Sequence, residues 1–323
     1  MAIKSPRIAV VLLLLVSFVW GGEFVLIDLA VAQIPTHTFN AIRFALASLS
    51  LLPLLWFTRK KNTQYSYIAL LKAGLLLGLL LFIGFYTQTE GLRFTSVSNA
   101  GFITGLSVPL VPFLGFLLFR THAAKSVWIG VVAATSGLYL LTIGDKLEFN
   151  YGDILVLICA FAFASHIILT GRFVDNLPVI PLSIIQLAAV AIYSTVAALI
   201  SPEPAFYYPD ANPVSWQEQL SAPIIIAAIL IAGILGTAYA FWAQSASQQI
   251  LEPHKVALIF ATEPVFAYLA AWLFLDEHLG TQGMIGAGLI IAGMLISELG
   301  DRKQKVSIEP LDQTTAAKQD FAE

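Results

Sequence analysis

The sequence predicts an all-α polytopic membrane protein with ten transmembrane helices, arranged as two inverted five-helix repeats. Hydrophobic residues make up 58% of the 323 residues and charged residues only 11%, whereas soluble domains contain about 25% charged residues. Ten stretches are apolar over about the length that crosses a bilayer. Residue patterns of the first half recur in the second at nearly constant offsets. These three observations together define the expected fold.

Each apolar stretch is expected to be a helix, because a hydrocarbon core about 30 Å thick needs about 20 helical residues. Backbone polar groups in lipid must also be satisfied within the spanning segment itself. The predicted spans are 8–32, 38–57, 68–89, 98–119, 127–143, 154–170, 180–200, 223–245, 256–275 and 280–299.

Two five-helix units and a tail follow from this pattern. The first repeat is expected at 8–143 and the second at 151–299, while 300–323 is polar and is expected to be a disordered cytoplasmic tail. With ten helices both termini lie on one side, and 14 of the 17 Lys and Arg residues fall on that side. The positive-inside rule therefore predicts cytoplasmic termini in a multi-pass protein of the cell (inner) membrane.

Several classes of function are excluded by what the sequence lacks. The one cysteine, Cys159, has no cysteine partner for a disulfide framework or a thiolate metal site. No basic tract suggests nucleic acid. No phosphate-binding glycine loop, dinucleotide fingerprint, HExxH or GxSxG motif is present. We therefore expect neither an enzyme nor a bound cofactor or metal.

The internal repeat is visible in helix-breaking and small residues. Residues 101–109 match 256–264, with an offset of 155, and two glycines of 127–143 match two of 280–299, with an offset of 156. Because each unit has an odd number of helices, the second must enter the membrane from the opposite side. The two prolines are also the predicted kinks at which gating helices bend. The matched residues are Pro109 with Pro264, Gly130 with Gly286 and Gly137 with Gly293.

Ionisable and polar residues at membrane depth are the main candidates for a functional site, because they are costly in lipid. Glu23 and Arg43 each lie ten residues from Gln33 in their connection, roughly 15 Å into the membrane at 1.5 Å per residue. They can face each other near the midplane. A packing role is the alternative, in which the two side chains form a buried ion pair and nothing else.

The second half repeats this layout, since His166 and Gln186 follow Glu23 and Arg43 at an offset of 143. Inverted-repeat transporters bind cargo at this level. His166 is a candidate proton carrier because imidazole titrates near neutral pH, or else a packing residue. Glu263, beside Pro264, is expected at the same level. The aromatic candidates for a pocket, each with lipid-facing or packing roles as the alternative, are Trp20, Tyr86, Tyr239 and Trp242.

Short motifs in both halves resemble those of the drug/metabolite transporter superfamily, in its ten-helix EamA-type branch. The resemblance covers nearly all of 8–299 and implies a central cavity, alternating access and export of amino acids or related metabolites. Two features depart from the family pattern, namely His122 in place of a frequent Glu, and Glu23 itself. The motifs are Phe18-Val19-Trp20-Gly21, Asn40-Ala41-Ile42-Arg43-Phe44, Ser107-Val108-Pro109, Glu263-Pro264-Val265-Phe266 and Asp276-Glu277-His278.

The expected function is transmembrane transport of a small metabolite by a secondary or facilitated mechanism, possible in a monomer or a homodimer. Glu23 and Glu263 suit an amine and Arg43 suits a carboxylate, so a zwitterionic or amphiphilic substrate is favoured. Protons are a candidate coupling ion, and a proton-coupled exporter and an uncoupled facilitator fit equally. The alternative is a membrane-embedded ligand-binding or sensory protein without net transport.

Overall fold

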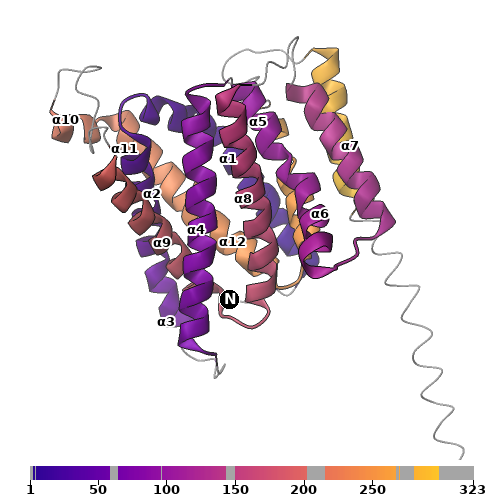
Figure 1. Ribbon diagram of the computed structural model, residues 1–323, viewed down its shortest axis with the longest axis horizontal. Coiled ribbons are helices and arrows are strands. Elements are labelled where there is room, and N and C mark those ends of the chain that lie inside the picture. Colours follow the sequence, from indigo (N-terminus) through magenta and orange to yellow (C-terminus); the bar gives the residue numbers. More distant parts are fainter. Residues whose placement is uncertain are drawn as a thin grey trace, which may run out of the picture.

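The computed structural model describes residues 3, 5–58, 65–95, 97–142, 150–201, 215–266, 269 and 280–297. The predicted tail at 300–323 and the Asp276-Glu277-His278 motif lie outside these residues. The helices form one bundle, in which the long ones stand side by side (Figure 1). In chain order they are α1 (Pro6–Val31), α2 (Thr36–Leu51), α3 (Leu55–Thr58), α4 (Tyr67–Leu92), α5 (Val97–Gly105), α6 (Ser107–Phe119), α7 (Lys125–Thr142), α8 (Tyr151–Val174), α9 (Val179–Ile200), α10 (Trp216–Leu220), α11 (Pro223–Leu230), α12 (Ala240–Ser247) and α13 (Pro253–Phe260).

The predicted all-helical membrane architecture is confirmed for the part of the chain that the structure describes. Six helical segments are long and apolar enough to cross a membrane, and a shorter apolar helix, Thr281–Ser297, follows them. Large apolar side chains point outward, for example Trp56, Leu199 and Ile200, which are 80%, 74% and 79% exposed. Such surfaces are stable in lipid and costly in water.

Two of the predicted spans are broken at matching points. The span at 98–119 is interrupted at Leu106, between α5 and α6, and the span at 256–275 is interrupted at Ala261 and Thr262, after α13. Each break precedes its proline by two or three residues, because proline lacks the N–H and clashes with the carbonyl four residues earlier. The helix then restarts with the proline in its first turn, where no donor is needed.

The span at 223–245 also departs from a regular α-helix. Between α11 and α12 the chain forms a π-helical stretch, Ile231–Tyr239, a rare geometry that is frequently found at functional sites. This stretch passes α1 and α2, and Gly236 within it lies against the Glu23 side chain. A side chain that presses into the hydrogen-bond ladder is a recognised cause of such irregularity.

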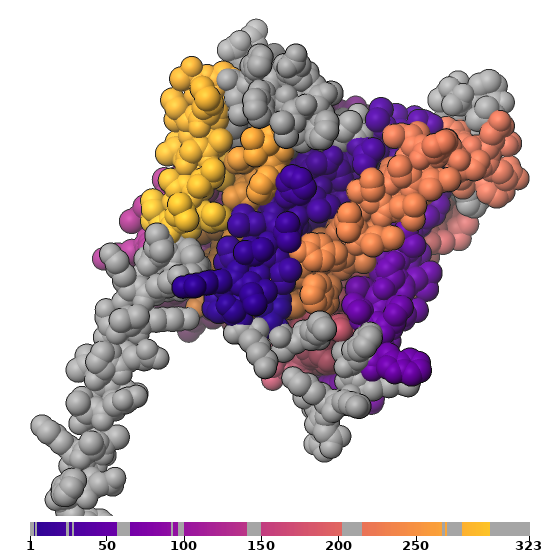
Figure 2. All heavy atoms as spheres, turned by 180° about the vertical axis from the view of Figure 1, so that it is seen from behind, coloured from indigo at the N-terminus to yellow at the C-terminus, as the bar shows by residue number. Residues whose placement is uncertain are grey.

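Helices of the two halves pack across one another. The bundle places α4 against α8 and α9, α2 against α9 and the π stretch, and α1 against α11, α12 and α13. Figure 2 shows α1 in indigo beside the orange α11–α12 segment on one face. Glycines allow the closest approaches, and a Cβ on Gly78 would lie 2.7 Å from the Gln186 carbonyl oxygen. A core cluster between the halves contains Phe44, Leu81, Leu187 and Phe241.

Candidate functional site

A buried ion pair joins α1 and α2. Arg43 Nη2 donates to Glu23 Oε1 across 2.8 Å, and the two side chains are only 2% and 4% exposed. Arg43 Nε also donates to Thr237 Oγ1 of the π stretch, at 2.7 Å. The second carboxylate oxygen, Glu23 Oε2, has no hydrogen-bond partner among the described residues. The pair is therefore held by three elements and leaves one acceptor unsatisfied, which is costly at this burial.

The walls around the pair are backbone and aromatic rings. Trp20 Nε1 donates to the Gly236 carbonyl oxygen at 2.7 Å, which ties α1 to the π stretch. Any Cβ on Gly236 would overlap the Glu23 carboxylate, so only glycine allows this contact. The Arg43 guanidinium lies 5.2 Å from the ring centre of Phe85 and 5.7 Å from that of Phe44, within cation–π range.

The matching pair of the second half, His166 and Gln186, is joined by a hydrogen bond rather than an ion pair. His166 Nε2 and Gln186 Oε1 are 2.9 Å apart and both side chains are fully buried. Gln244 Nε2 approaches His166 Nδ1 at 3.5 Å. A neutral imidazole with its proton on Nε2 satisfies both bonds, since it donates to the side-chain oxygen Oε1 of Gln186 and accepts from Nε2 of Gln244. Gln248 then continues the network, accepting from Gln244 at 3.3 Å and donating to the Ile167 carbonyl oxygen at 2.7 Å.

Glu263 extends the first site from a third direction. It follows the break after α13 and is partly buried. Its carboxylate lies within electrostatic range of Glu23 and of Cys159. Among the described residues, two carboxylates therefore share one region with the Arg43 guanidinium.

Three of the four aromatic candidates, Trp20, Tyr239 and Trp242, pack against one core cluster. Trp20 borders the pair and packs on Phe260, with ring centres 4.8 Å apart. Tyr239, in the π stretch, donates from its hydroxyl to the Leu12 carbonyl oxygen at 3.1 Å. Trp242 packs against Tyr239 at 6.2 Å. Tyr86 lies on α4, where its ring stacks on those of His37 at 4.8 Å and Phe82 at 5.9 Å.

Comparison with known proteins identifies the family. The EamA-like transporter family model matches residues 7–143 and 150–299. The chain belongs to the EamA-like transporter family. It is 29% identical over 287 residues to an uncharacterized transporter of Archaeoglobus fulgidus, covering 89% of this chain and 84% of that protein. It is 22% identical over 308 residues to the uncharacterized transporter YwfM of Bacillus subtilis, covering 91% and 95%.

The fold of this EamA-like transporter is also found in a solved protein. A crystal structure with 15% sequence identity superposes with a TM-score of 0.74 and covers 93% of this chain and 99% of that one. The resemblance inferred from short motifs is thus confirmed at the level of the family. The protein is a multi-pass membrane transporter of small molecules rather than an enzyme, and the bilayer is its solvent.

Sequence reasoning missed several polar residues of the EamA-like transporter that contact the predicted pairs. Thr237 bonds Arg43, and Gln244 and Gln248 extend the His166 network. Their signal was present, because glutamine is expensive within an apolar span and these two are spaced four residues apart, on one helix face. Thr237 gave no such signal, since a threonine can satisfy its hydroxyl on its own helix.

Proposed function

We propose that this EamA-like transporter carries a small zwitterionic or amphiphilic metabolite, of the amino-acid class, across the membrane. The observation that carries the proposal is the buried Glu23–Arg43 pair, with Glu23 Oε2 unsatisfied among the described residues and a second carboxylate, Glu263, within electrostatic range. An ammonium group suits the two carboxylates, and a carboxylate suits the planar guanidinium fork.

Binding can proceed by exchange of ion-pair partners. In the structure the Arg43 guanidinium is paired with the Glu23 carboxylate. A zwitterion that gives its carboxylate to Arg43 releases Glu23, which then receives the ammonium group of the same molecule. One buried ion pair becomes two, so Glu23, Arg43 and both charges of the zwitterion each have an opposite partner, as charges in a low-dielectric interior require. The rings of Trp20 and Phe85 beside the pair suit an apolar side chain.

We further propose alternating access between two inverted repeats at 8–143 and 151–299. If the halves are exchanged, α1 corresponds to α8, α2 to α9, and α4 to the π stretch with α12. The contact of α1 with α12 then corresponds to that of α8 with α4, and the contact of α2 with the π stretch corresponds to that of α9 with α4. Both contacts are made. The breaks at Leu106 and Ala261 share the offset of Pro109 and Pro264. Interrupted helices at a repeat interface are common in transporters, and Pro109 and Pro264 are the proposed hinges.

The proposed direction is export from the cytoplasm through the cell (inner) membrane, with both termini cytoplasmic. Proton coupling through His166 and uncoupled facilitation remain the two versions of this mechanism, and either fits a monomer or a homodimer. His166 and Gln186 take the proton-carrier and orienting roles in the first version. The charge bias of the sequence supports the orientation, and the family resemblance supports the direction.

The decisive experiment is efflux of preloaded, labelled amino acids from proteoliposomes, with and without a pH gradient. The native protein, Glu23→Gln and His166→Ala are compared with Glu90→Gln, whose carboxylate forms a surface pair with Arg93 at 3.0 Å. We expect saturable flux that Glu23→Gln abolishes and Glu90→Gln preserves. Native-like flux in Glu23→Gln would reject the site.

The same vesicles distinguish the alternative function. Saturable binding of a labelled solute, with flux that never exceeds leak from empty vesicles across a broad panel, would favour a membrane-embedded ligand-binding protein over a carrier of amino acids. Gradient-dependent flux that becomes gradient-independent in His166→Ala would select the proton-coupled version.

A further inference from the structure

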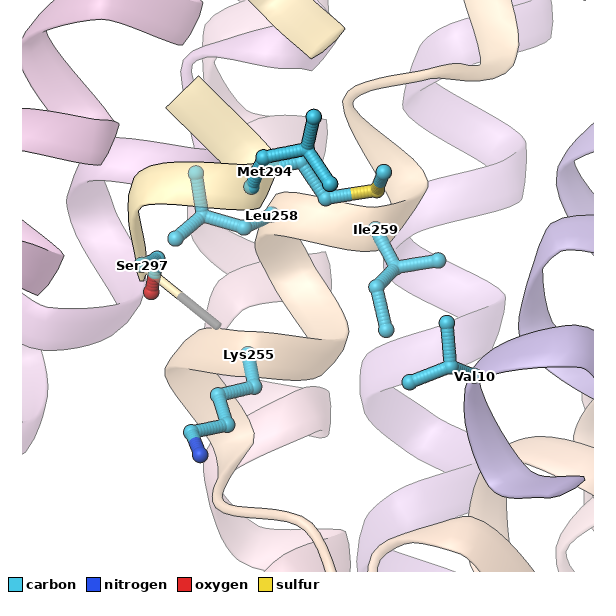
Figure 3. Close-up of a pocket in the computed structure, with 7 residues that line it drawn as sticks. Val10, Lys255, Leu258, Ile259, Met294 and Ser297 are labelled. Carbon is cyan, nitrogen blue, oxygen red and sulfur yellow. The ribbon is translucent and has the colours of Figure 1, made fainter. Parts of the chain in front are cut away.

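A small pocket lies far from the ion pair, between α1, α13 and the helix Thr281–Ser297. Its walls are apolar and come from all three helices, with Val10 on α1, Leu258 and Ile259 on α13, and Met294 on the last helix. Figure 3 shows these side chains at one end of the pocket and the Lys255 ammonium group at the other. The pocket thus has an apolar part and a cationic end.

Lys255 supplies the positive charge at this end of the pocket. Lys255 lies in the first turn of α13. Arg7 is exposed on α1, one turn before Val10 and on the same helix face. The nearby carboxylate of Glu252 lies 3.3 Å from His254 Nε2. Two cationic side chains from two helices therefore mark the end of the bundle where the chain begins.

A buried hydroxyl also lines the pocket. Ser297 is 2% exposed, and its Oγ has no hydrogen-bond partner among the described residues. A buried polar group without a partner is unfavourable, and an acceptor oxygen at this position would satisfy it. The pocket therefore offers a hydroxyl donor and an ammonium group beside an apolar wall.

We propose that this pocket binds an anionic phospholipid from the leaflet on the side of the N-terminus. Its phosphate would interact with Lys255 and Arg7, one of its oxygens would accept from Ser297 Oγ, and an acyl chain would lie on Val10, Ile259 and Met294. Leu295, which also lines the pocket, is 47% exposed, so the pocket opens toward the surrounding hydrocarbon rather than into the bundle. A soluble anion would match the cations but leave this apolar wall uncovered, and therefore we favour a lipid. The proposal does not depend on the substrate.

The test is native mass spectrometry of the delipidated full-length protein in detergent, titrated separately with phosphatidylglycerol, phosphatidylcholine and inorganic phosphate. We expect one tight phosphatidylglycerol site. Lys255→Gln should weaken it about fivefold, as expected for loss of one cation near an anionic headgroup. Lys72→Gln removes an exposed lysine of α4 at the same end of the bundle and should leave the affinity unchanged.

A second variant tests the apolar part independently. Val10→Trp fills the pocket and should weaken the binding of both phospholipids, while Lys255→Gln removes only the preference for the anionic one. Equal affinity for the two phospholipids, equal effects of Lys255→Gln and Lys72→Gln, or phosphate binding as tight as that of phosphatidylglycerol would overturn the proposal. Thermal melting of each variant in detergent confirms that a loss of binding is not a loss of fold.

Discussion

Gly130 of α7 and Gly293 of the last helix face each other so closely that a Cβ on either would lie 2.5 Å from the carbonyl oxygen of the other. A Cβ on Gly137 would lie 2.5 Å from the Gly286 carbonyl oxygen. From the first contact to the second, residue numbers rise along α7 and fall along the last helix, so the two helices are antiparallel here. The two contacts interchange when the halves are exchanged, because Gly130 corresponds to Gly286 and Gly137 to Gly293. The helices thus approach each other through glycines at both contacts, the packing mode expected in lipid.

Gly293→Ala should destabilise the protein by about 1–3 kcal/mol, because the added methyl group forces two backbones apart. Gly288→Ala is the matched control, since no atom lies within 4 Å of its Cβ position on the same helix. Thermal melting in detergent measures both. Equal melting temperatures for the two variants would show that the α7 contact contributes no stability.

Removal of one partner of the Glu23–Arg43 pair should cost about 3–5 kcal/mol, because it leaves a buried charge uncompensated. Glu23→Gln and Arg43→Gln should each show this loss, and the double variant should recover a large part of it. Glu90→Gln should change stability by less than about 1 kcal/mol, since its pair is at the surface. Additive losses in the double variant would contradict a direct interaction. Denaturation in mild detergent provides the four free energies.

Gly236→Ala should perturb both stability and transport. Its Cβ would overlap the Glu23 carboxylate, so the carboxylate or the π stretch must move, at a cost of about 1–3 kcal/mol. The displaced carboxylate should also lower solute flux in proteoliposomes. Gly101→Ala, which meets nothing within 4 Å, should retain native flux. Unchanged transport in Gly236→Ala would separate the π stretch from the substrate site.

Transport by the native protein should vary with pH if His166 carries the coupling proton. Acidification adds a proton to Nδ1, the nitrogen that faces Gln244 Nε2, and two donors then oppose each other. His166→Gln retains hydrogen bonding without titration and should give a flat profile. His122→Gln changes an exposed histidine and should keep the native profile. A flat native profile would favour facilitation.

Much of the fold and the two polar pairs of the candidate site could be predicted from the sequence. The apolar spans and the proline and glycine offsets predicted helices and a repeat, because both depend on local chemistry. Glu23 with Arg43, and His166 with Gln186, were expected at matching depths, and each pair is in hydrogen-bonding distance. Their part in binding cargo stays a prediction.

Other features depend on partners that are distant in sequence. The π stretch forms where Gly236 lies against Glu23, 213 residues earlier in the chain. The partner that another helix gives Tyr86 was not predicted either, because spacing along one helix indicates a face but not the neighbour on that face. His37 occupies that place. Thr237 became a site residue only through contact with Arg43.

The π stretch between α11 and α12 sets the helical register of the segment that follows it. A π-helix closes its hydrogen bonds one residue later than an α-helix, so a return to α-geometry advances the remaining residues by one position. Each position turns an α-helix by about 100°. Gly236 and Thr237, which touch the ion pair, lie inside this stretch. The twist of this helix and the pairing of Glu23 with Arg43 are therefore coupled.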